Sequence, residues 1–179
     1  VAAIADEVRA ATGSSKRVDI SFDEWNVWYL ERYRAEDEPT GIDNWPLAPR
    51  LLEDAYSVAD AVVVGSLLIS LLKHADRVTS ASQAQLVNVI APIMTEPGGP
   101  AWRQTTYFPF ATTSRLATGT AVRVAVESPE YDTTAHGRVP LIDAVATHDQ
   151  RSGRTAVFLV NRSESDEAAV TLDLSALGA

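Results

Sequence analysis

The sequence predicts an α/β region followed by an all-β region, and three features lead to this expectation. Over residues 17–82, a strand pattern, a long helical pattern and a second strand pattern follow one another, which describes a βαβ unit with parallel strands. Beyond Gly119 the sequence turns to Val- and Ala-rich segments that mostly alternate apolar and polar side chains, as half-buried strands do. The hydrophobic share of 46% over 179 residues is enough for a packed core. We therefore expect two domains, over residues 1–118 and 119–179.

The first two elements are a helix and a strand. Apolar residues at helical spacing predict a helix over residues 2–12, and Gly13 can end it in the left-handed conformation. Val18 and Ile20 then alternate with polar neighbours, which predicts a strand over residues 17–22.

A long loop is expected next. Residues 31–49 are rich in charge and contain three prolines and a glycine, a composition typical of a connection rather than of a helix or strand. In α/β barrels, a loop after a strand shapes the substrate cleft. Trp45 lies within this loop, and an aromatic side chain in a polar loop needs a packing partner or a ligand.

Two helices and one strand complete the α/β region. The longest helical pattern covers residues 51–74, with Pro49 just before it and acidic residues in its first turn. Small side chains over residues 77–82 predict a buried strand. A further helix is expected over residues 104–116, and Pro109 within it should make this helix begin late or kink.

The all-β region contains four predicted strands, over residues 120–127, 141–148, 155–161 and 169–174. Ser152-Gly153 predicts a tight turn between the second and third of them. Before this region, Pro97-Gly98-Gly99-Pro100 predicts a loop.

The composition excludes several classes of partner. The net charge of −9 argues against nucleic acid, which binds to a basic stripe. The absence of cysteine rules out disulfides and thiolate metal sites, and the histidines are not spaced as a metal pair, so we expect no metal and no cofactor.

No segment reaches the roughly 20 apolar residues of a membrane span. The sequence begins without Met or a basic region, which predicts the middle of a longer chain rather than a signal peptide.

The stretch from Ile20 to Tyr29 is the best candidate for a functional site. It begins as a strand and delivers Asp23 and Glu24 at the C-terminal end of that strand, where α/β barrels carry out their chemistry. The aromatic residues that follow supply flat faces, which suit the apolar side of a sugar ring. A carboxylate pair after a strand is also common as a helix cap or as surface charge. The aromatic residues and Asn26 around the pair favour a site.

Four segments of the sequence carry a family resemblance. They are Phe22–Trp28, Gln85–Thr95, Gly98–Thr105 and Pro129–Thr133. In this order they resemble the α-L-arabinofuranosidases of glycoside hydrolase family fifty-one, and the first segment is similar to the nucleophile segment of that family. The resemblance implies the last strand–helix units of a (β/α)8 TIM barrel followed by a C-terminal β-sandwich domain, which is incomplete here. It also implies a retaining hydrolase that releases terminal non-reducing α-L-arabinofuranosyl residues from arabinose-containing oligosaccharides and polysaccharides.

The resemblance gives roles to individual residues. Glu24 is implied as the catalytic nucleophile at the end of the seventh barrel strand. Gln85 is implied as a contact to a sugar hydroxyl, and Asn26, Trp28 and Trp102 complete the implied substrate-binding set.

The second carboxyl that this chemistry needs is missing from the sequence. A retaining glycosidase requires an acid/base about 5 to 5.5 Å from the nucleophile. Asp23 is a poor candidate because successive strand side chains point to opposite faces. In the resembled family the acid/base is a Glu preceded by Asn on an earlier barrel strand, and no Asn-Glu dipeptide occurs here. We therefore expect the missing N-terminal part of the same enzyme to supply it, and this chain to be inactive alone.

The resemblance also implies a homo-oligomer for the full-length enzyme, since the resembled enzymes often assemble as hexamers, and a cytoplasmic location, with secretion left open. Two alternatives remain. A non-catalytic carbohydrate-binding or structural β module would lack a parallel βαβ unit in the first hundred residues or so. A related barrel hydrolase could act on a different sugar.

Overall fold

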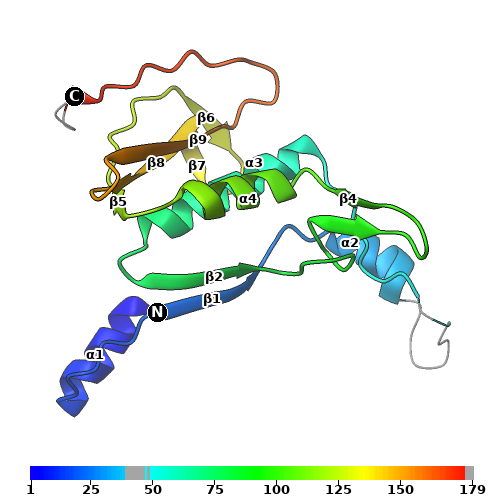
Figure 1. Ribbon diagram of the computed structural model, residues 1–179, viewed down its shortest axis with the longest axis horizontal. Coiled ribbons are helices and arrows are strands. Elements are labelled where there is room, and N and C mark those ends of the chain that lie inside the picture. Colours follow the sequence, from blue (N-terminus) through cyan, green and yellow to red (C-terminus); the bar gives the residue numbers. More distant parts are fainter. Residues whose placement is uncertain (39–46, 48, 176–179) are drawn as a thin grey trace.

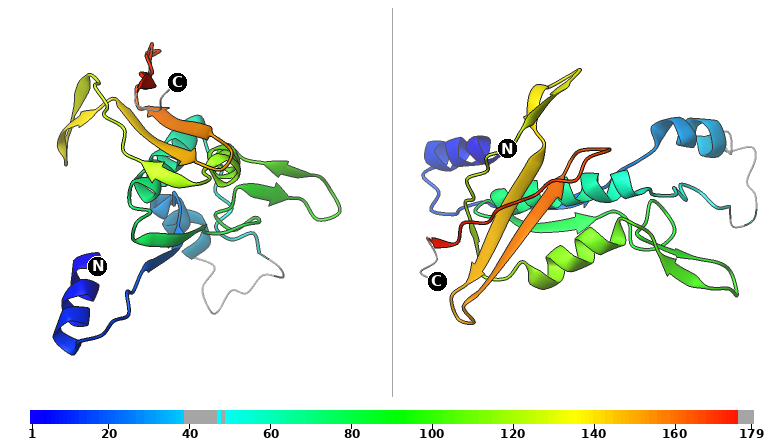
Figure 2. Two further views of the ribbon diagram at one scale, coloured as in Figure 1. Left: turned by 60° about the vertical axis from the view of Figure 1, so that its left-hand side comes forward. Right: turned by 90° about the horizontal axis from the view of Figure 1, so that it is seen from above.

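The computed structural model describes residues 1–38, 47 and 49–175, and it arranges them in layers (Figure 1). Helices α3 (Val58–Lys73) and α4 (Tyr107–Leu116) pack against each other and lie between two sheets. One sheet is the parallel pair β1 (Ile20–Trp25) and β2 (Val78–Gln83). The other is a three-stranded antiparallel sheet, and the turned views of Figure 2 show the same layering. Helix α3 contacts both sheets and is therefore the centre of the fold.

The predicted parallel βαβ unit is confirmed, because β1 and β2 pair in parallel and α3 connects them through the core. The pairing argues against the alternative of a non-catalytic carbohydrate-binding or structural β module, which would lack such a unit. Helix α1 (Ala2–Thr12) has the predicted bounds and ends at Gly13, whose φ of 64° is left-handed. This helix stands clear of the helix layer (Figure 1) and is tied to the parallel pair by the Arg77 Nη1–Asp6 Oδ2 ion pair of 2.5 Å.

The prediction of a continuous loop over residues 31–49 is wrong at its beginning. Helix α2 (Leu30–Arg32) runs directly into the π-helical turn η1 (Tyr33–Asp37). Local Arg–Glu pairs, three and four residues apart, stabilise these turns. Residues 39–46 and 48 of the predicted loop, Trp45 among them, lie outside the described residues.

The predicted start of the long helix is also wrong. Helix α3 begins at Val58 rather than near Leu51, because Ser57 and Asp60 form a reciprocal capping box at its N-terminus. The backbone before the helix forms tertiary hydrogen bonds instead. For example, the Tyr56 N–H donates to Oε1 of Gln104, and the Leu52 carbonyl accepts from the Ile90 N–H. Helix α4 begins at Tyr107, so Pro109 falls in its first turn, where it is tolerated. The predicted late start of that helix is confirmed.

In sequence order, a hairpin that we did not predict falls between β2 and α4. Strands β3 (Ile93–Thr95) and β4 (Ala101–Arg103) pair in an antiparallel register around the predicted Pro97–Pro100 loop. Figure 1 shows this hairpin extending away from the helix layer.

The region after Gly119 is all-β, as predicted. Strands β5 (Thr120–Val122), β8 (Ile142–Asp149) and β9 (Arg154–Asn161) form one sheet in the order β5-β8-β9. Strands β6 (Glu130–Thr133) and β7 (Gly137–Pro140) form a separate hairpin. The strand predicted over residues 120–127 therefore ends early, and the one predicted over residues 169–174 is absent. Residues 162–175 instead run as an extended tail (Figure 1).

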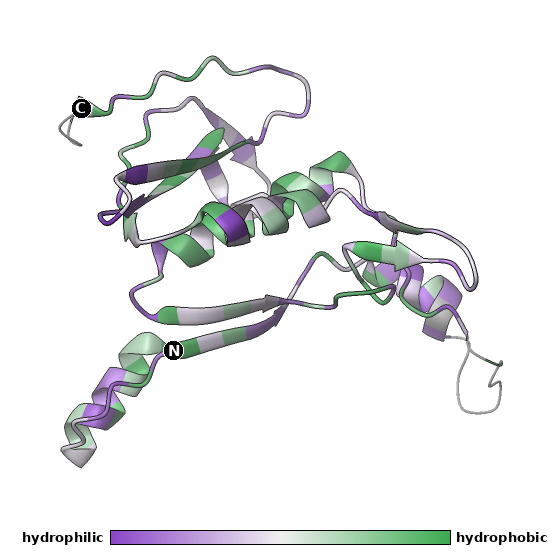
Figure 3. Ribbon diagram, viewed as in Figure 1, coloured by the Kyte–Doolittle hydropathy of each residue, from purple (hydrophilic) through white to green (hydrophobic). Residues whose placement is uncertain are grey.

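The core is centred on α3. Figure 3 shows hydrophobic residues along much of this helix, and Val64 and Leu68 are buried against Trp25 of β1. Within the described residues the strands form small sheets and no closed barrel. The TIM barrel and the β-sandwich that the resemblance implies therefore stay predictions, since the described strands form an open parallel pair, an open antiparallel sheet and two hairpins.

Candidate functional site

The C-terminal end of β1 is anchored by Trp25. This side chain is 7% exposed, packs against Val64 and Leu68, and has its ring centroid 6.2 Å from that of Phe110. Trp25 is therefore a core residue of the helix layer and does not present a face to a ligand. By fixing the last residue of the strand, it also fixes where the preceding carboxylates emerge.

The register of β1 is irregular where the two carboxylates lie. Phe22 pairs with Ala81 and Trp25 pairs with Gln83. Between these two pairs β1 therefore contains one residue more than β2. An extra residue of this kind re-aims side chains, and such irregularities are frequent beside active sites. Asp23 and Glu24 are both exposed at this point. Glu24 is thus accessible at the carboxyl end of a parallel strand.

Asn26 joins the end of β1 to the segment that follows β2. Its Nδ2 donates to the carbonyl oxygens of Ala84 (2.6 Å) and Ile90 (2.5 Å). Its Oδ1 accepts from the backbone N–H of Val27 (2.8 Å) and from Nε2 of Gln83 (3.0 Å). The amide is therefore engaged within the protein on both sides. Its predicted contact with substrate stays a prediction.

Tyr56 also holds the segment that follows β1. This residue is 8% exposed, and its hydroxyl donates to the Val27 carbonyl at 2.9 Å and accepts from Asn26 Nδ2 at 3.3 Å. Burial raises the pKa of the Tyr56 hydroxyl far above its usual value, and the nearby carboxylates of Asp54 and Asp60 act in the same direction. The group is therefore a fixed neutral hydrogen-bond partner rather than an acid or base.

A carboxylate at the start of α3 holds Tyr29. The Tyr29 hydroxyl lies 2.7 and 2.8 Å from the two carboxylate oxygens of Asp60. This hydrogen bond, with a contribution from burial, raises the pKa of Tyr29. The backbone N–H of Tyr29 donates to the buried Asp54 carboxylate at 3.2 Å. The chain just after β1 is thus tied to the N-terminus of the central helix.

The remaining residues of the predicted site lie on three different segments. Trp28 is 48% exposed, and its ring lies 5.5 Å from that of Tyr33. Gln85 is exposed and lines a pocket of about 510 Å³ between β2 and α4. Trp102 is 42% exposed on the separate β3–β4 hairpin. The structure brings the Glu24, Trp28 and Gln85 segments together through Asn26. Trp102 lies on a separate hairpin, and its predicted contact with substrate stays a prediction.

Sequence reasoning missed the polar residues that organise this region: Asp54, Tyr56, Asp60 and Gln104. Gln104 donates through Nε2 to the carbonyls of Asp54 (3.0 Å) and Ala91 (2.7 Å). The Ser57-x-x-Asp60 spacing is a capping-box pattern and could have located the helix start. The other contacts join residues far apart in sequence, and no local pattern encodes them.

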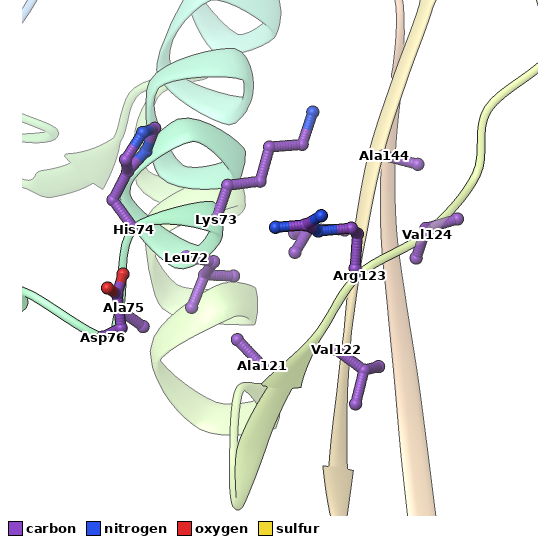
Figure 4. Close-up of a pocket in the computed structure, with 11 residues that line it drawn as sticks. Leu72, Lys73, His74, Ala75, Asp76, Ala121, Val122, Arg123, Val124 and Ala144 are labelled. Carbon is purple, nitrogen blue, oxygen red and sulfur yellow. The ribbon is translucent and has the colours of Figure 1, made fainter.

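A second pocket lies at the opposite end of α3. Figure 4 shows this pocket, of about 450 Å³, between the end of the helix and the segment Ala121–Val124, with Lys73, His74 and Arg123 around it. Lys73 pairs with Asp143 of β8. No residue of the predicted site lines this pocket, so it is separate from the candidate site.

Two further findings concern only the part of the chain that the structure describes. No three His, Cys, Asp or Glu side chains there gather as a metal site would require. None of the helices in that part is both long enough and apolar enough to cross a membrane.

The relatives of this chain are glycosidases. Over 164 residues it is 58% identical to an exo-α-(1→6)-L-arabinofuranosidase of Bifidobacterium longum, which covers 91% of this chain and 31% of that protein. Over 177 residues it is 56% identical to an intracellular exo-α-(1→5)-L-arabinofuranosidase of Streptomyces lividans, covering 99% of this chain and 26% of the relative. The chain therefore spans about a quarter to a third of the length of these curated relatives.

Solved structures give the same result. A family fifty-one α-L-arabinofuranosidase from Bifidobacterium longum matches with a TM-score of 0.84 at 49% identity, over 90% of this chain and 33% of that one. The family fifty-one enzyme of Xanthomonas axonopodis pv. citri matches with a TM-score of 0.69 at 27% identity, over 92% of this chain and 30% of its own. The family model of the α-L-arabinofuranosidase C-terminal domain matches residues 23–179. The chain belongs to this family, and the predicted resemblance is confirmed.

Proposed function

We propose that this chain carries the nucleophile of a retaining exo-α-L-arabinofuranosidase and acts within a polypeptide of its relatives' length. The observation that carries the proposal is the exposed Glu24 carboxylate at the carboxyl end of a parallel strand. It lies two residues before Asn26, whose hydrogen bonds join the segments of Trp28 and Gln85. The activities for which the relatives are named support arabinofuranose release. In this proposal β1 and β2 are the last two strands of a TIM barrel, and a β-sandwich domain begins near residue 119.

The proposed reaction proceeds in two steps. The Glu24 carboxylate attacks the anomeric carbon of a terminal arabinofuranosyl residue, and the bond to the leaving oxygen breaks while a second carboxyl protonates that oxygen. The same second carboxyl then removes a proton from water, which attacks the anomeric carbon and releases Glu24. A region outside residues 1–179 supplies this acid/base in the proposal.

The proposed substrate contacts come from aromatic and amide side chains. Trp28 and Trp102 are the exposed aromatic faces for sugar rings, and Gln85 and Asn26 are the amide contacts to hydroxyls. The substrate class is arabinose-containing oligosaccharides and polysaccharides. The names of the relatives support α-(1→5) or α-(1→6) linkages and a cytoplasmic location. A homo-oligomer of the full-length enzyme is part of the proposal.

The test replaces Glu24 in the full-length polypeptide and uses 4-nitrophenyl α-L-arabinofuranoside as substrate. We expect Glu24→Gln to lower kcat/KM more than about a thousandfold, as loss of a nucleophile does in other covalent catalysts. Asp23→Asn is the matched control, because Asp23 is the adjacent exposed carboxylate, and its kcat/KM should stay within about tenfold of the wild-type value. Near-normal turnover by Glu24→Gln would rule out this role.

A second measurement identifies the covalent step. Azide added to Glu24→Gly should restore turnover and give an arabinofuranosyl azide of inverted configuration, because the small anion attacks from the side that the carboxylate vacates. An azide product of retained configuration would mean that a different carboxylate forms the glycosyl-enzyme, and it would contradict the assignment of Glu24 as the nucleophile.

A further inference from the structure

We infer that Tyr56 is a positioning residue for this reaction, because its buried hydroxyl fixes the peptide that connects Glu24 to Trp28. The inference rests on the proposed function. The hydroxyl donates to the Val27 carbonyl at 2.9 Å and accepts from the Asn26 amide at 3.3 Å. Asn26 and Val27 lie in sequence between Glu24, the proposed nucleophile, and Trp28, the proposed aromatic contact to the sugar.

Three of the proposed site residues, Glu24, Trp28 and Gln85, lie close in sequence to one hydrogen-bonded group. We call Asn26, Tyr56 and Gln83 the Tyr56 cluster. Gln83 donates to Asn26 Oδ1 at 3.0 Å, and Asn26 Nδ2 donates to the Ala84 carbonyl at 2.6 Å. Glu24 stands two residues before Asn26, Trp28 two residues after it, and Gln85 directly after Ala84. The relative placement of three segments thus depends on this cluster.

The position of Tyr56 is fixed independently of any substrate. Its backbone N–H donates to Oε1 of Gln104 at 3.0 Å, and its ring centroid lies 6.4 Å from that of Tyr29. Gln104 is held in turn by the carbonyls of Asp54 and Ala91. Because Tyr56 is only 8% exposed, its hydroxyl acts through Asn26 and Val27 rather than on a sugar.

Removal of this hydroxyl should misplace the proposed nucleophile without removing it. Tyr56→Phe keeps the ring, so the packing against Tyr29 remains, but the Val27 carbonyl loses its donor. A displacement of about 1 Å can cost about a hundredfold in rate. Loss of one hydrogen-bonding group among several that hold the segment should cost about tenfold by the same reasoning.

The experiment measures labelling of Glu24 in the full-length enzyme. An arabinofuranose-configured epoxide alkylates the nucleophile of a retaining glycosidase, and mass spectrometry identifies the modified residue. The rate constant of labelling is measured for the wild type, for Tyr56→Phe and for the control Tyr131→Phe, which loses a hydroxyl from the exposed strand β6. Each rate is taken from the time course of molecules that become labelled. A loss of folded protein therefore lowers the amplitude and leaves the rate constant unchanged.

A second variant changes Gln83, another member of the Tyr56 cluster. Gln83→Leu removes the donor to Asn26 Oδ1, and in the described part of the chain the buried Oε1 of Gln83 has no partner to lose. We expect Tyr56→Phe to label about tenfold more slowly and Gln83→Leu about threefold more slowly, with Tyr131→Phe at the wild-type rate.

The outcomes separate the two proposals. Wild-type label on a residue other than Glu24 overturns the proposed function, and this inference with it. Label on Glu24 at the wild-type rate in both cluster variants overturns the inference alone. If Tyr56→Phe does not fold, the rate measured for Gln83→Leu decides: slower labelling supports the positioning role, and an unchanged rate overturns it.

Discussion

Gly119 connects the α/β region to β5 with a backbone that few other residues could adopt. Its φ is +81°, and a Cβ built on it would lie 2.2 Å from the carbonyl oxygen of His148. The obstruction comes from the backbone of β8, which cannot rotate away as a side chain would. Both the dihedral angle and the contact therefore require glycine at this position.

We expect Gly119→Ala to lower the free energy of unfolding by more than about 2 kcal/mol, since the left-handed conformation alone costs roughly 1 to 2 kcal/mol for an L-residue. Gly137→Ala is the matched control. Its φ is +66°, but a Cβ there meets nothing within 4 Å, so only the conformational cost of about 1 kcal/mol remains. Urea unfolding of the two variants measures the difference. Equal losses would show that the contact with His148 is relieved without cost.

Single residues of the candidate site could be predicted to the extent that their surroundings are local. Glu24 and Trp28 lie in one short segment, and strand ends and aromatic spacing are visible in sequence. The sequence predicts a flat face for a sugar at each aromatic residue that follows Glu24, yet the first of these, Trp25, is buried against α3. Asn26 binds partners 58 and 64 residues away. Such contacts form only when β1 and β2 pair, and the local pattern of apolar and polar residues does not predict them.

At the scale of elements, the capping box of α3 sets where the helix layer begins. Asp60 is 5% exposed and accepts from the Ser57 N–H at 2.6 Å and from the Tyr29 hydroxyl. One carboxylate therefore caps the helix and also holds the segment after β1. The start of α3 and the geometry of the candidate site depend on the same group.

We expect Ser57→Ala to lower the free energy of unfolding by about 1 kcal/mol, the usual value of an N-cap. Asp60→Ala should cost more, about 2 to 4 kcal/mol, because it removes the acceptor of three donors: the Ser57 N–H, the Ser57 hydroxyl and the Tyr29 hydroxyl. Ser70→Ala is the control, since Ser70 is exposed within the same helix and alanine has the higher helix propensity. Thermal unfolding followed by circular dichroism tests the ranking. A smaller effect for Asp60→Ala than for Ser57→Ala would contradict it.

Elements were predictable where the signal lies within the element itself. Gly13 ends α1 and Pro109 delays α4, and both effects are local. The strands of the β3–β4 hairpin have three residues each, which is too short to show periodicity. Strand β5 exists only over the residues that pair with β8. Residues 169–174 have a strand pattern but pair with nothing in the described residues, and a strand needs a partner for its backbone.

At the scale of the whole molecule, α3 connects the candidate site to the β region. Its 16 residues span about 24 Å at 1.5 Å per residue. The N-terminus of the helix holds Tyr29, and its last residue, Lys73, pairs with Asp143 of β8. Asp143 also accepts from Arg162 Nη2 at 3.0 Å. One carboxylate therefore neutralises two cations at the junction of helix and sheet.

This junction should make the two regions unfold together. All four tryptophans lie in residues 1–118, so their fluorescence reports on the α/β region, while far-ultraviolet circular dichroism also reports on the β region. In the wild type we expect the two signals to give one midpoint, as a cooperative transition requires. Asp143→Ala leaves Lys73 and Arg162 without their shared partner. It should lower the free energy of unfolding by about 2 kcal/mol and separate the two midpoints.

Lys73→Met and Lys16→Met provide the matched comparison, because both remove a lysine charge and only Lys73 contacts the sheet. Lys73→Met should reproduce part of the separation, because Arg162 still pairs with Asp143. Lys16→Met should leave both midpoints in place. Coincident midpoints in Asp143→Ala would mean that apolar packing of α3 on β8 and β9 couples the regions without this ion pair.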